Sequence, residues 1–568
     1  MLRRLSSSRS EIKYKRFGTK DVKSNSLPRL LSISSTALAN FTAQYNFQSI
    51  AIALIVMSSS ECTLNSNNCD DGSQKSWVKG TANAVIFVGA VIGQLSMGFL
   101  GDYLSRNSAL AVTLSISAIS ALFSAILPYG NPTTIYSIVL SCRFFIGIGL
   151  GGIYPLSATK ASEDIILNST STSSSSINVG IAFLWQIPGL IVPWLLALLL
   201  TYTTISTNIR WRLILGIGCI PSILAILCLL GQNYYTNSTI QSTIKPTSTN
   251  RIESIKPIDT DGLLSIKPVD KIESNLYTQL CNPIVRTQLL VCGGTWLLYD
   301  IVFYGLALLG SVVIDNMSIN ETNMNISSNH NIRLVCIQQV VVYTMCLLPM
   351  LFTIYLLHIY TLKYLQILGF IVEGLLLLLF VSLFSYLKEH NSTGLFILYC
   401  LALMSLQLGV PVTTYALPAS VFDKDIRCTF NGIASAMGKI GAIIGAYSFY
   451  YIAKESIHAV LIICVIVSLI GAVVTYYYLP DAYLCNKDTR RQERCTTSMT
   501  LLEATLSGHD EEMLLQSALS WNTWDSTSGN SENNDSSSIV YNKVHNNSSS
   551  TGSINTSNEY NNSFVVEL

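Results

Sequence analysis

The sequence has few charged residues and long stretches with none. Only 12% of its 568 residues are Asp, Glu, Lys or Arg, against roughly 25% in a typical soluble domain, while 50% are apolar. The formal net charge of +1 argues against the strongly basic surface that nucleic-acid binding requires. This composition disfavours a soluble protein of several domains, which the length alone would suggest.

The patterns of enzymes and metal sites are also missing. The fourteen cysteines contain no C-x-x-C pair and no clustered Cys/His spacing, so no metal or cofactor is predicted. We find neither a nucleophile–base set nor a glycine loop that would cradle a phosphate, and we expect no enzyme. Residues 1–30 are basic and polar, without the apolar core of a signal peptide.

Long apolar runs fill the middle of the chain instead. A helix needs about 20 apolar residues to cross a bilayer core with its backbone amides satisfied. Twelve such runs lie near residues 34–57, 80–100, 109–128, 134–158, 177–201, 211–230, 288–313, 333–357, 364–386, 394–417, 429–451 and 457–478. The fifth and tenth are the least cleanly bounded, because Pro and Gly interrupt them. We therefore predict an all-α membrane protein with twelve transmembrane helices.

A polar stretch divides the twelve runs into two sets of six. The predicted parts are a cytoplasmic segment at 1–33, a six-helix half at 34–230, a central loop at 231–287, a second half at 288–478 and a disordered cytoplasmic tail at 479–568. This layout resembles the major facilitator superfamily, in which the two halves surround a midplane site and expose it alternately.

Lys and Arg residues are concentrated before the first run, in the central loop and after the last run. By the positive-inside rule both termini are cytoplasmic, and we expect a multi-pass protein of the plasma membrane. The loops on the other side carry glycosylation sequons at Asn316, Asn320, Asn325 and Asn391. The first of these loops holds Cys62 and Cys69, for which a disulfide and two unpaired thiols are both open.

The tail contains two short patterns typical of contact motifs. Asp510, Leu514 and Leu515 fit an acidic dileucine signal for a sorting adaptor, and the terminal Val566-Glu567-Leu568 fits a PDZ groove. A tail that makes neither contact is the simpler interpretation.

Between the second and third runs the sequence reads Gly98-Phe-Leu-Gly-Asp102-Tyr-Leu-Ser-Arg106. This segment resembles the signature loop of the major facilitator superfamily. Glycine lets two helices approach closely, and the Asp can pair with a base or cap a helix. The resemblance implies that Gly98, Asp102 and Arg106 form a conformational latch, and Arg143 is grouped with them.

Polar residues inside the runs mark a candidate site. In the seventh run Trp296, Asp300 and Tyr304 are spaced four apart and therefore share one helix face. A carboxylate there costs about 2.5–3.5 kcal/mol on insertion scales, so Asp300 should face a cavity or a partner. Lys439 is a cation in the eleventh run, and it could pair with Asp300 or bind a buried anion. A purely structural ion pair is the alternative.

The fourth run contains Gly151-Gly-Ile-Tyr154-Pro155-Leu-Ser-Ala, and the eleventh contains Gly438-Lys439-Ile-Gly441-Ala442. With the seventh-run motif and Gln186 in the fifth run, these segments resemble the phosphate:proton symporter family, which includes fungal and plant high-affinity transporters. The likeness covers nearly all twelve runs and neither tail. It implies a midplane site for inorganic phosphate made of Tyr154, Gln186, Trp296, Asp300, Tyr304 and Lys439.

That residue set suits a tetrahedral oxyanion. Phosphate accepts several hydrogen bonds and is stabilised by one cation, and hydroxyls, an amide, an indole and an ammonium supply both. An ionised Asp300 would repel the anion, whereas a protonated Asp300 can donate to it. The resemblance therefore implies coupling of phosphate to protons through Asp300.

The chain departs from the family at several positions. Where the family carries acids in the first run, this sequence has Ala43 and Asn46, and Ile153 replaces an Asp in the fourth run. Pro411 replaces an Asn in the tenth. Glu373 in the ninth run either compensates for the lost acids or packs against a polar group of a neighbouring helix.

Three functions therefore stay open. The chain is a phosphate transporter, proton-coupled or uncoupled, or a carrier of another small solute such as an organic anion or a sugar. The third is a nutrient receptor that binds without transporting and signals through its tail.

Overall fold

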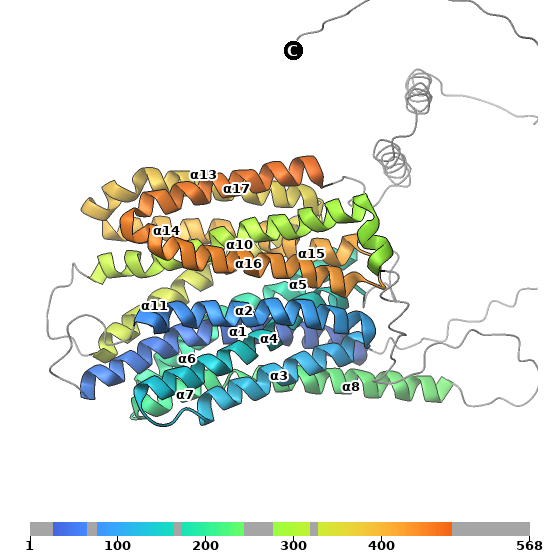
Figure 1. The fold of residues 1–568 in the computed structure, drawn as a ribbon, viewed down its shortest axis with the longest axis horizontal. Coiled ribbons are helices and arrows are strands. Elements are labelled where there is room, and N and C mark those ends of the chain that lie inside the picture. Colours follow the sequence, from blue (N-terminus) through green and yellow to red (C-terminus); the bar gives the residue numbers. More distant parts are fainter. Residues whose placement is uncertain (1–25, 65–75, 164–171, 244–275, 319–327, 480–568) are drawn as a thin grey trace, which may run out of the picture. The chain divides into compact units, whose positions relative to one another are not determined.

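The computed structural model describes residues 26–64, 76–163, 172–243, 276–318 and 328–479, which are almost entirely helical (Figure 1). The predicted fold class, an all-α membrane protein, is confirmed, whereas the count of twelve transmembrane helices stays a prediction. The predicted sorting motif and the side chains of Cys62 and Cys69 lie outside what the structure describes.

Each predicted run corresponds to one helix or to a pair of helices. The first half contains α1 (Ser26–Leu64), α2 (Ser76–Tyr103), α3 (Arg106–Ile126), α4 (Pro132–Glu163), the pair α5 (Thr172–Leu184) and α6 (Gln186–Thr201), and the pair α7 (Thr207–Gly216) and α8 (Cys219–Thr243). The second half contains α10 (Pro283–Ser318), the pair α11 (Ser328–Met345) and α12 (Leu347–Leu356), α13 (Leu362–His390), the pair α14 (Ser392–Leu406) and α15 (Val410–Val421), α16 (Arg427–Glu455) and α17 (Ile457–Tyr478).

The paired helices are interrupted for a common reason. Each interruption lies two to four residues before a proline, at Pro188, Pro221, Pro349 or Pro411. Proline has no N–H to donate to the carbonyl four residues earlier, so the helix ladder loses a bond there. The break before Pro411 is the widest and includes Gly409, whose φ of 77° is a conformation that glycine adopts without strain.

Ten helices within the described residues are long and apolar enough to cross a membrane. α1 and α16 are not among the ten, although they lie over the first and eleventh predicted runs. Both place polar side chains at the centre of the molecule, such as Gln44 on α1 and Lys439 on α16.

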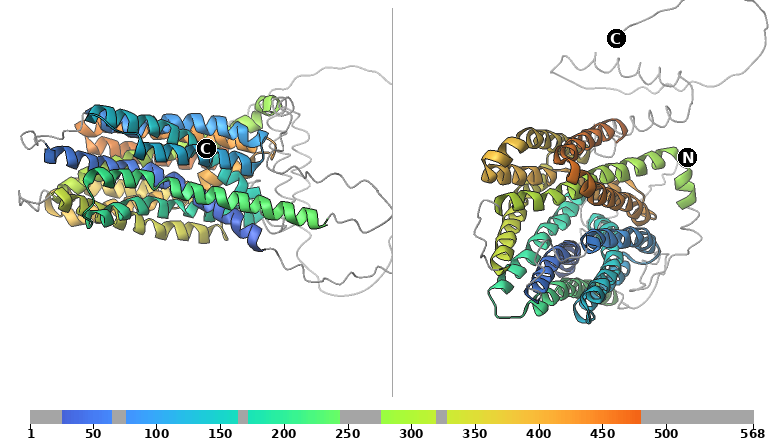
Figure 2. Two further views of the ribbon diagram at one scale, coloured as in Figure 1. Left: turned by 90° about the horizontal axis from the view of Figure 1, so that it is seen from below. Right: turned by 60° about the vertical axis from the view of Figure 1, so that its left-hand side comes forward.

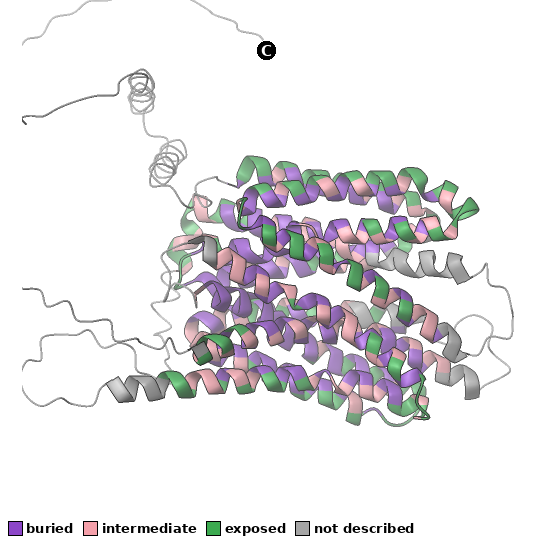
Figure 3. Ribbon diagram, turned by 180° about the vertical axis from the view of Figure 1, so that it is seen from behind, coloured by how far each residue is buried: buried purple, intermediate pink, exposed green. Residues whose placement is uncertain are grey.

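The outer faces of the helices carry large apolar side chains that are exposed, among them Leu375, Leu378 and Leu379 of α13 (Figure 3). Exposed apolar surface this extensive is unusual for a protein surrounded by water. The two halves form adjacent bundles, and α2 of the first packs along α16 of the second (Figure 2).

Glycine makes a close helix contact of the first half possible. α2 and α4 touch through backbone atoms, and a Cβ on Gly151 would overlap the carbonyl oxygen of Ala90. In contrast, a Cβ on Gly294 of α10 would meet nothing within 4 Å.

Gly151→Ala is therefore expected to destabilise the protein by about 1–3 kcal/mol, the usual penalty for overpacking a close contact. Gly294→Ala is the matched control and should be neutral or slightly stabilising, because Ala is the better helix former. Thermal unfolding of the purified proteins in detergent measures both effects. Equal melting midpoints for the two variants would contradict the close packing of α2 on α4.

Candidate functional site

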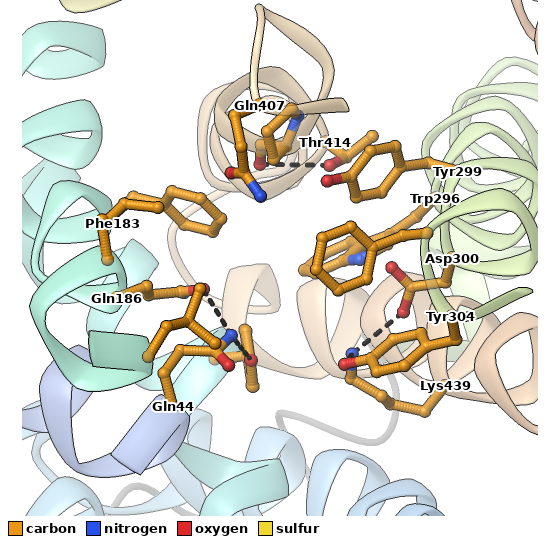
Figure 4. Close-up of a pocket in the computed structure, with 15 residues that line it drawn as sticks. Gln44, Phe183, Gln186, Trp296, Tyr299, Asp300, Tyr304, Gln407, Thr414 and Lys439 are labelled. Atoms are coloured by element: carbon orange, nitrogen blue, oxygen red, sulfur yellow. Dashed lines mark hydrogen bonds and ion pairs between the residues drawn. The ribbon is translucent and has the colours of Figure 1, made fainter. Parts of the chain in front are cut away.

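A polar cavity lies between the two halves (Figure 4). Residues from both halves line it, and Figure 4 places Gln44 and Gln186 opposite Asp300, Tyr304 and Lys439. All the residues predicted for the substrate site line this one cavity: Tyr154, Gln186, Trp296, Asp300, Tyr304 and Lys439.

The cavity contains a buried ion pair. Nζ of Lys439 lies 2.9 Å from Oδ2 of Asp300, and both side chains are almost completely buried. The same ammonium donates to the hydroxyl of Tyr304 at 3.2 Å. Trp296 completes this side, and Gly438 allows it to lie against α16, because a Cβ at that position would overlap the indole. The spacing of four along α10 therefore gives the shared face that the sequence predicts.

Aromatic rings surround the Lys439 ammonium. The ring centroids of Tyr304 and Tyr154 lie 5.0 and 5.2 Å from Nζ, and those of Phe47 and Phe87 lie 5.8 and 6.0 Å away. Cations are attracted to aromatic faces within about 6 Å. Rings from both halves thus stabilise the charge where water has little access.

Amide side chains form the opposite wall. Gln44 donates to the hydroxyl of Tyr154 at 3.1 Å and to Oε1 of Gln186 at 2.7 Å. Gln186 in turn donates to Oδ1 of Asn40 at 2.9 Å. Nδ2 of Asn40 donates to the hydroxyl of Tyr415 on α15, at 3.1 Å, so this network joins the two halves.

Sequence reasoning missed Asn40, Gln44 and Tyr415 as site residues. A signal existed, because Asn40 and Gln44 are four residues apart in an apolar run and therefore share a face. Two positions at which the related family has acids do not contribute polar groups here, because Ala43 and Ile153 are apolar and completely buried. Pro411, which replaces an amide of the related family, lines the cavity.

Glu373 lies outside the cavity lining and is fully buried between α13 and α17. It accepts a hydrogen bond from Ser468 at 2.7 Å. This contact matches the alternative in which it packs against a polar group of a neighbouring helix.

One end of the bundle is closed by contacts between the halves. Asp102, at the end of α2, accepts hydrogen bonds from the backbone N–H groups of Cys428 and Thr429, at 3.2 and 2.7 Å. It also accepts a hydrogen bond from the Thr429 hydroxyl at 2.7 Å, and its Oδ1 lies 2.7 Å from Nη1 of Arg106. A carboxylate of the first half thus caps the first turn of α16 in the second half, where the helix dipole favours negative charge.

Glu163, at the end of α4, extends these contacts. Its carboxylate lies 3.2 Å from Nε of Arg106 and 3.2 Å from Nη1 of Arg427. Arg106 also donates to the carbonyl of Lys424 across the same seam at 2.7 Å. We call Asp102, Arg106, Glu163 and Arg427 the latch. The sequence offered no pattern that points to Glu163.

Gly98 lies at this seam, where a Cβ would crowd the carbonyl oxygen of Cys428 at 2.8 Å. Arg143, by contrast, is not in the latch. It lies twenty residues before Glu163 on α4 and donates to the carbonyl of Asn46 on α1 at 2.9 Å. Because an α-helix rises 1.5 Å per residue, that separation is about 30 Å, so Arg143 makes its contacts far from Asp102 and Arg106.

A cavity between two six-helix halves, closed at one end by charged contacts across the seam, is the architecture of a membrane carrier. Two family models match the chain: one described as "Sugar (and other) transporter" over residues 33–235, and one described as "Major Facilitator Superfamily" over residues 340–524. The chain belongs to the major facilitator superfamily.

Curated relatives are similar over most of their lengths. "Inorganic phosphate transporter PT2" of Toxoplasma gondii is 28% identical over 449 residues, which are 79% of this chain and 72% of the relative. "Inorganic phosphate transporter 1-6" of Oryza sativa subsp. japonica is 26% identical, with 66% and 74% covered. These relatives confirm the resemblance to phosphate transporters that the motifs indicate.

Solved structures share the fold. The proton:xylose symporter XylE bound to 6-bromo-6-deoxy-D-glucose matches with a TM-score of 0.58 and 15% identity, over 80% of this chain and 96% of that one. A double Trp mutant of XylE matches with a TM-score of 0.62, also at 15% identity, over 82% and 98%. At this identity the likeness shows the fold alone.

Proposed function

We propose that this chain carries inorganic phosphate across a membrane by alternating access. The observation that supports this most strongly is the Lys439 ammonium in a buried cavity that is also lined by Tyr154, Tyr304 and three glutamine amides. A tetrahedral oxyanion is stabilised by one cation and several donors. The similarity to inorganic phosphate transporters supports the same substrate.

The ion pair supports a mechanism in which phosphate is coupled to a proton. While Asp300 is ionised, it neutralises Lys439 and would repel an incoming anion. A proton on Asp300 frees the ammonium for phosphate and turns the carboxyl group into a donor. Loss of the proton re-forms the pair and expels the anion. Asp300 is therefore the proposed proton-coupling residue.

Alternating access requires that the two ends open in turn. At the end opposite the latch, the halves meet where Gln48 donates to the Tyr343 hydroxyl at 2.9 Å. Arg333 donates there to the carbonyl of Thr201 at 2.9 Å. Breaking these contacts would admit substrate from one side, and breaking the latch would release it on the other.

We also propose the orientation and the membrane. The positive residues of the termini and the central loop place these segments in the cytoplasm, which puts the latch on the cytoplasmic side. Asn391, a predicted glycosylation site, is exposed between α13 and α14, and this position would face outwards. A plasma-membrane location fits these features.

The substrate is tested by competition in cells that lack their own phosphate transporters. Labelled phosphate should be taken up, arsenate should block uptake, and a carboxylate or a hexose should leave it unchanged. An epitope label at the cell surface controls for expression. Surface protein without uptake would rule out phosphate transport.

A neutral solute such as a sugar is the second candidate. The charges of Asp300 and Lys439 cancel each other, which favours a neutral substrate. The amide and aromatic side chains of the cavity walls also suit a polyol as well as an anion. Uptake of a labelled hexose that arsenate does not affect would select this function instead.

A further inference from the structure

Arg143 of α4 is a buried cation outside the central cavity. Its side chain is fully buried, and its Nη1 donates to the Asn46 carbonyl at 2.9 Å and to the Ser49 hydroxyl at 3.4 Å. Its Nε and Nη2 have no hydrogen-bond partner in the part of the chain that the structure describes. Two donors of a guanidinium therefore lie unused in the interior of the first half.

No carboxylate among the described residues forms an ion pair with Arg143. The nearest candidate position is occupied by Asn46, which stands where the resemblance places an acid. The Asn46 amide donates to the carbonyls of Thr42 and Gly218, both at 3.1 Å. Asn46 is neutral, so these hydrogen bonds do not balance the charge, and its Oδ1 has no hydrogen-bond partner among the described residues.

A guanidinium stays protonated in proteins, so Arg143 cannot escape its burial by losing a proton. Isolated buried charges are very costly, and proteins pair them or bind an ion. Asp102, Glu163 and Asp300 are already committed to the latch and to Lys439. The missing negative charge must come from outside the described part of the chain.

We propose that Arg143 holds a small, weakly hydrated monovalent anion of the chloride class, which replaces a carboxylate counter-ion. Its partners are Nε and Nη2 of Arg143. Ile50, next to Ser49 in the chain, and Val139, one turn before Arg143 on α4, belong to a buried apolar cluster, so this part of the first half offers too few donors for a phosphate.

The residues of α1 that contact Arg143 indicate how the anion reaches the site. Asn46 and Ser49 flank Gln48, whose amide bonds Tyr343 across the seam at the end opposite the latch. Opening that end brings this stretch of α1 towards water, so the anion exchanges in the state in which substrate enters. The inference does not depend on phosphate being the substrate.

The test uses thermal unfolding of the purified full chain in sodium chloride and in sodium gluconate at equal ionic strength. Chloride should raise the melting midpoint saturably by about 2–4 °C. Bromide should act like chloride. The same midpoint in both salts would overturn the proposal.

Two variants locate the effect. Asn46→Asp supplies a carboxylate beside Arg143, so it should be as stable in gluconate as the parent is in chloride, and it should lose the response to chloride. Arg143→Gln should lose the response as well. Arg212→Gln, at an arginine bonded to the Ala125 carbonyl within the first half, is the control and should keep the response. A chloride response that persists in Asn46→Asp would also overturn the proposal, even if Arg143→Gln fails to fold.

Discussion

Lys439→Gln and Asp300→Asn are each expected to lower phosphate uptake roughly 100-fold, which corresponds to the loss of a charge-assisted hydrogen bond to the substrate. Lys439→Gln removes the cation that binds the anion. Asp300→Asn removes the proton carrier, so any remaining uptake should not vary with pH. Uptake of labelled phosphate at two pH values, corrected for surface protein, measures both effects.

The same pair makes a separate prediction for stability. Each single substitution leaves a buried charge without its partner, which typically costs about 3–5 kcal/mol. The double variant Asp300→Asn/Lys439→Gln removes both charges and should regain much of that stability without regaining transport. Lys363→Gln, at a lysine that does not line the cavity, is the control. If the double variant transports like the parent, the pair has no role in substrate binding.

Asp102→Asn is expected to open the latch end. Asp102 accepts three hydrogen bonds from the start of α16 besides its contact with Arg106, so the neutral amide should weaken closure by about 2–3 kcal/mol. This loss of closure energy raises the population of the open state roughly 30- to 150-fold. Cys428 is fully buried at this seam and reports on the opening.

Labelling of Cys428 by a membrane-permeant maleimide, followed by mass spectrometry of its peptide, measures the shift. The thiol should react far faster in Asp102→Asn than in the parent. Asp423→Asn, at an exposed acid before α16 that makes no ion pair in the described structure, should leave the rate unchanged. Equal rates in the parent and Asp102→Asn would show that Asp102 does not hold the halves together.

Features that depend on local sequence were predicted well. The lengths of the apolar runs predicted where the helices lie. Proline and glycine interrupt the fifth and tenth runs, and these runs form the helix pairs α5 and α6 and α14 and α15. The spacing of four along α10 placed Asp300 and Tyr304 on the face that meets Lys439. These properties follow from helical periodicity alone.

Features that depend on contacts between distant segments were not predictable. Glu163 and Arg427 are 264 residues apart and meet only because the halves close on each other. The sequence grouped Arg143 with the latch residues, but its position along α4 brings its guanidinium to the Asn46 carbonyl of α1. Gln44 lies between the departures at Ala43 and Asn46 in the sequence, and only the fold brings its amide between Tyr154 and Gln186.

Uptake of labelled phosphate by the purified chain in proteoliposomes tests the central claim most directly. The account predicts saturable uptake above that of protein-free liposomes, blocked by arsenate and nearly absent with Lys439→Gln. Phosphate binding without flux would contradict it and would indicate a receptor instead of a carrier.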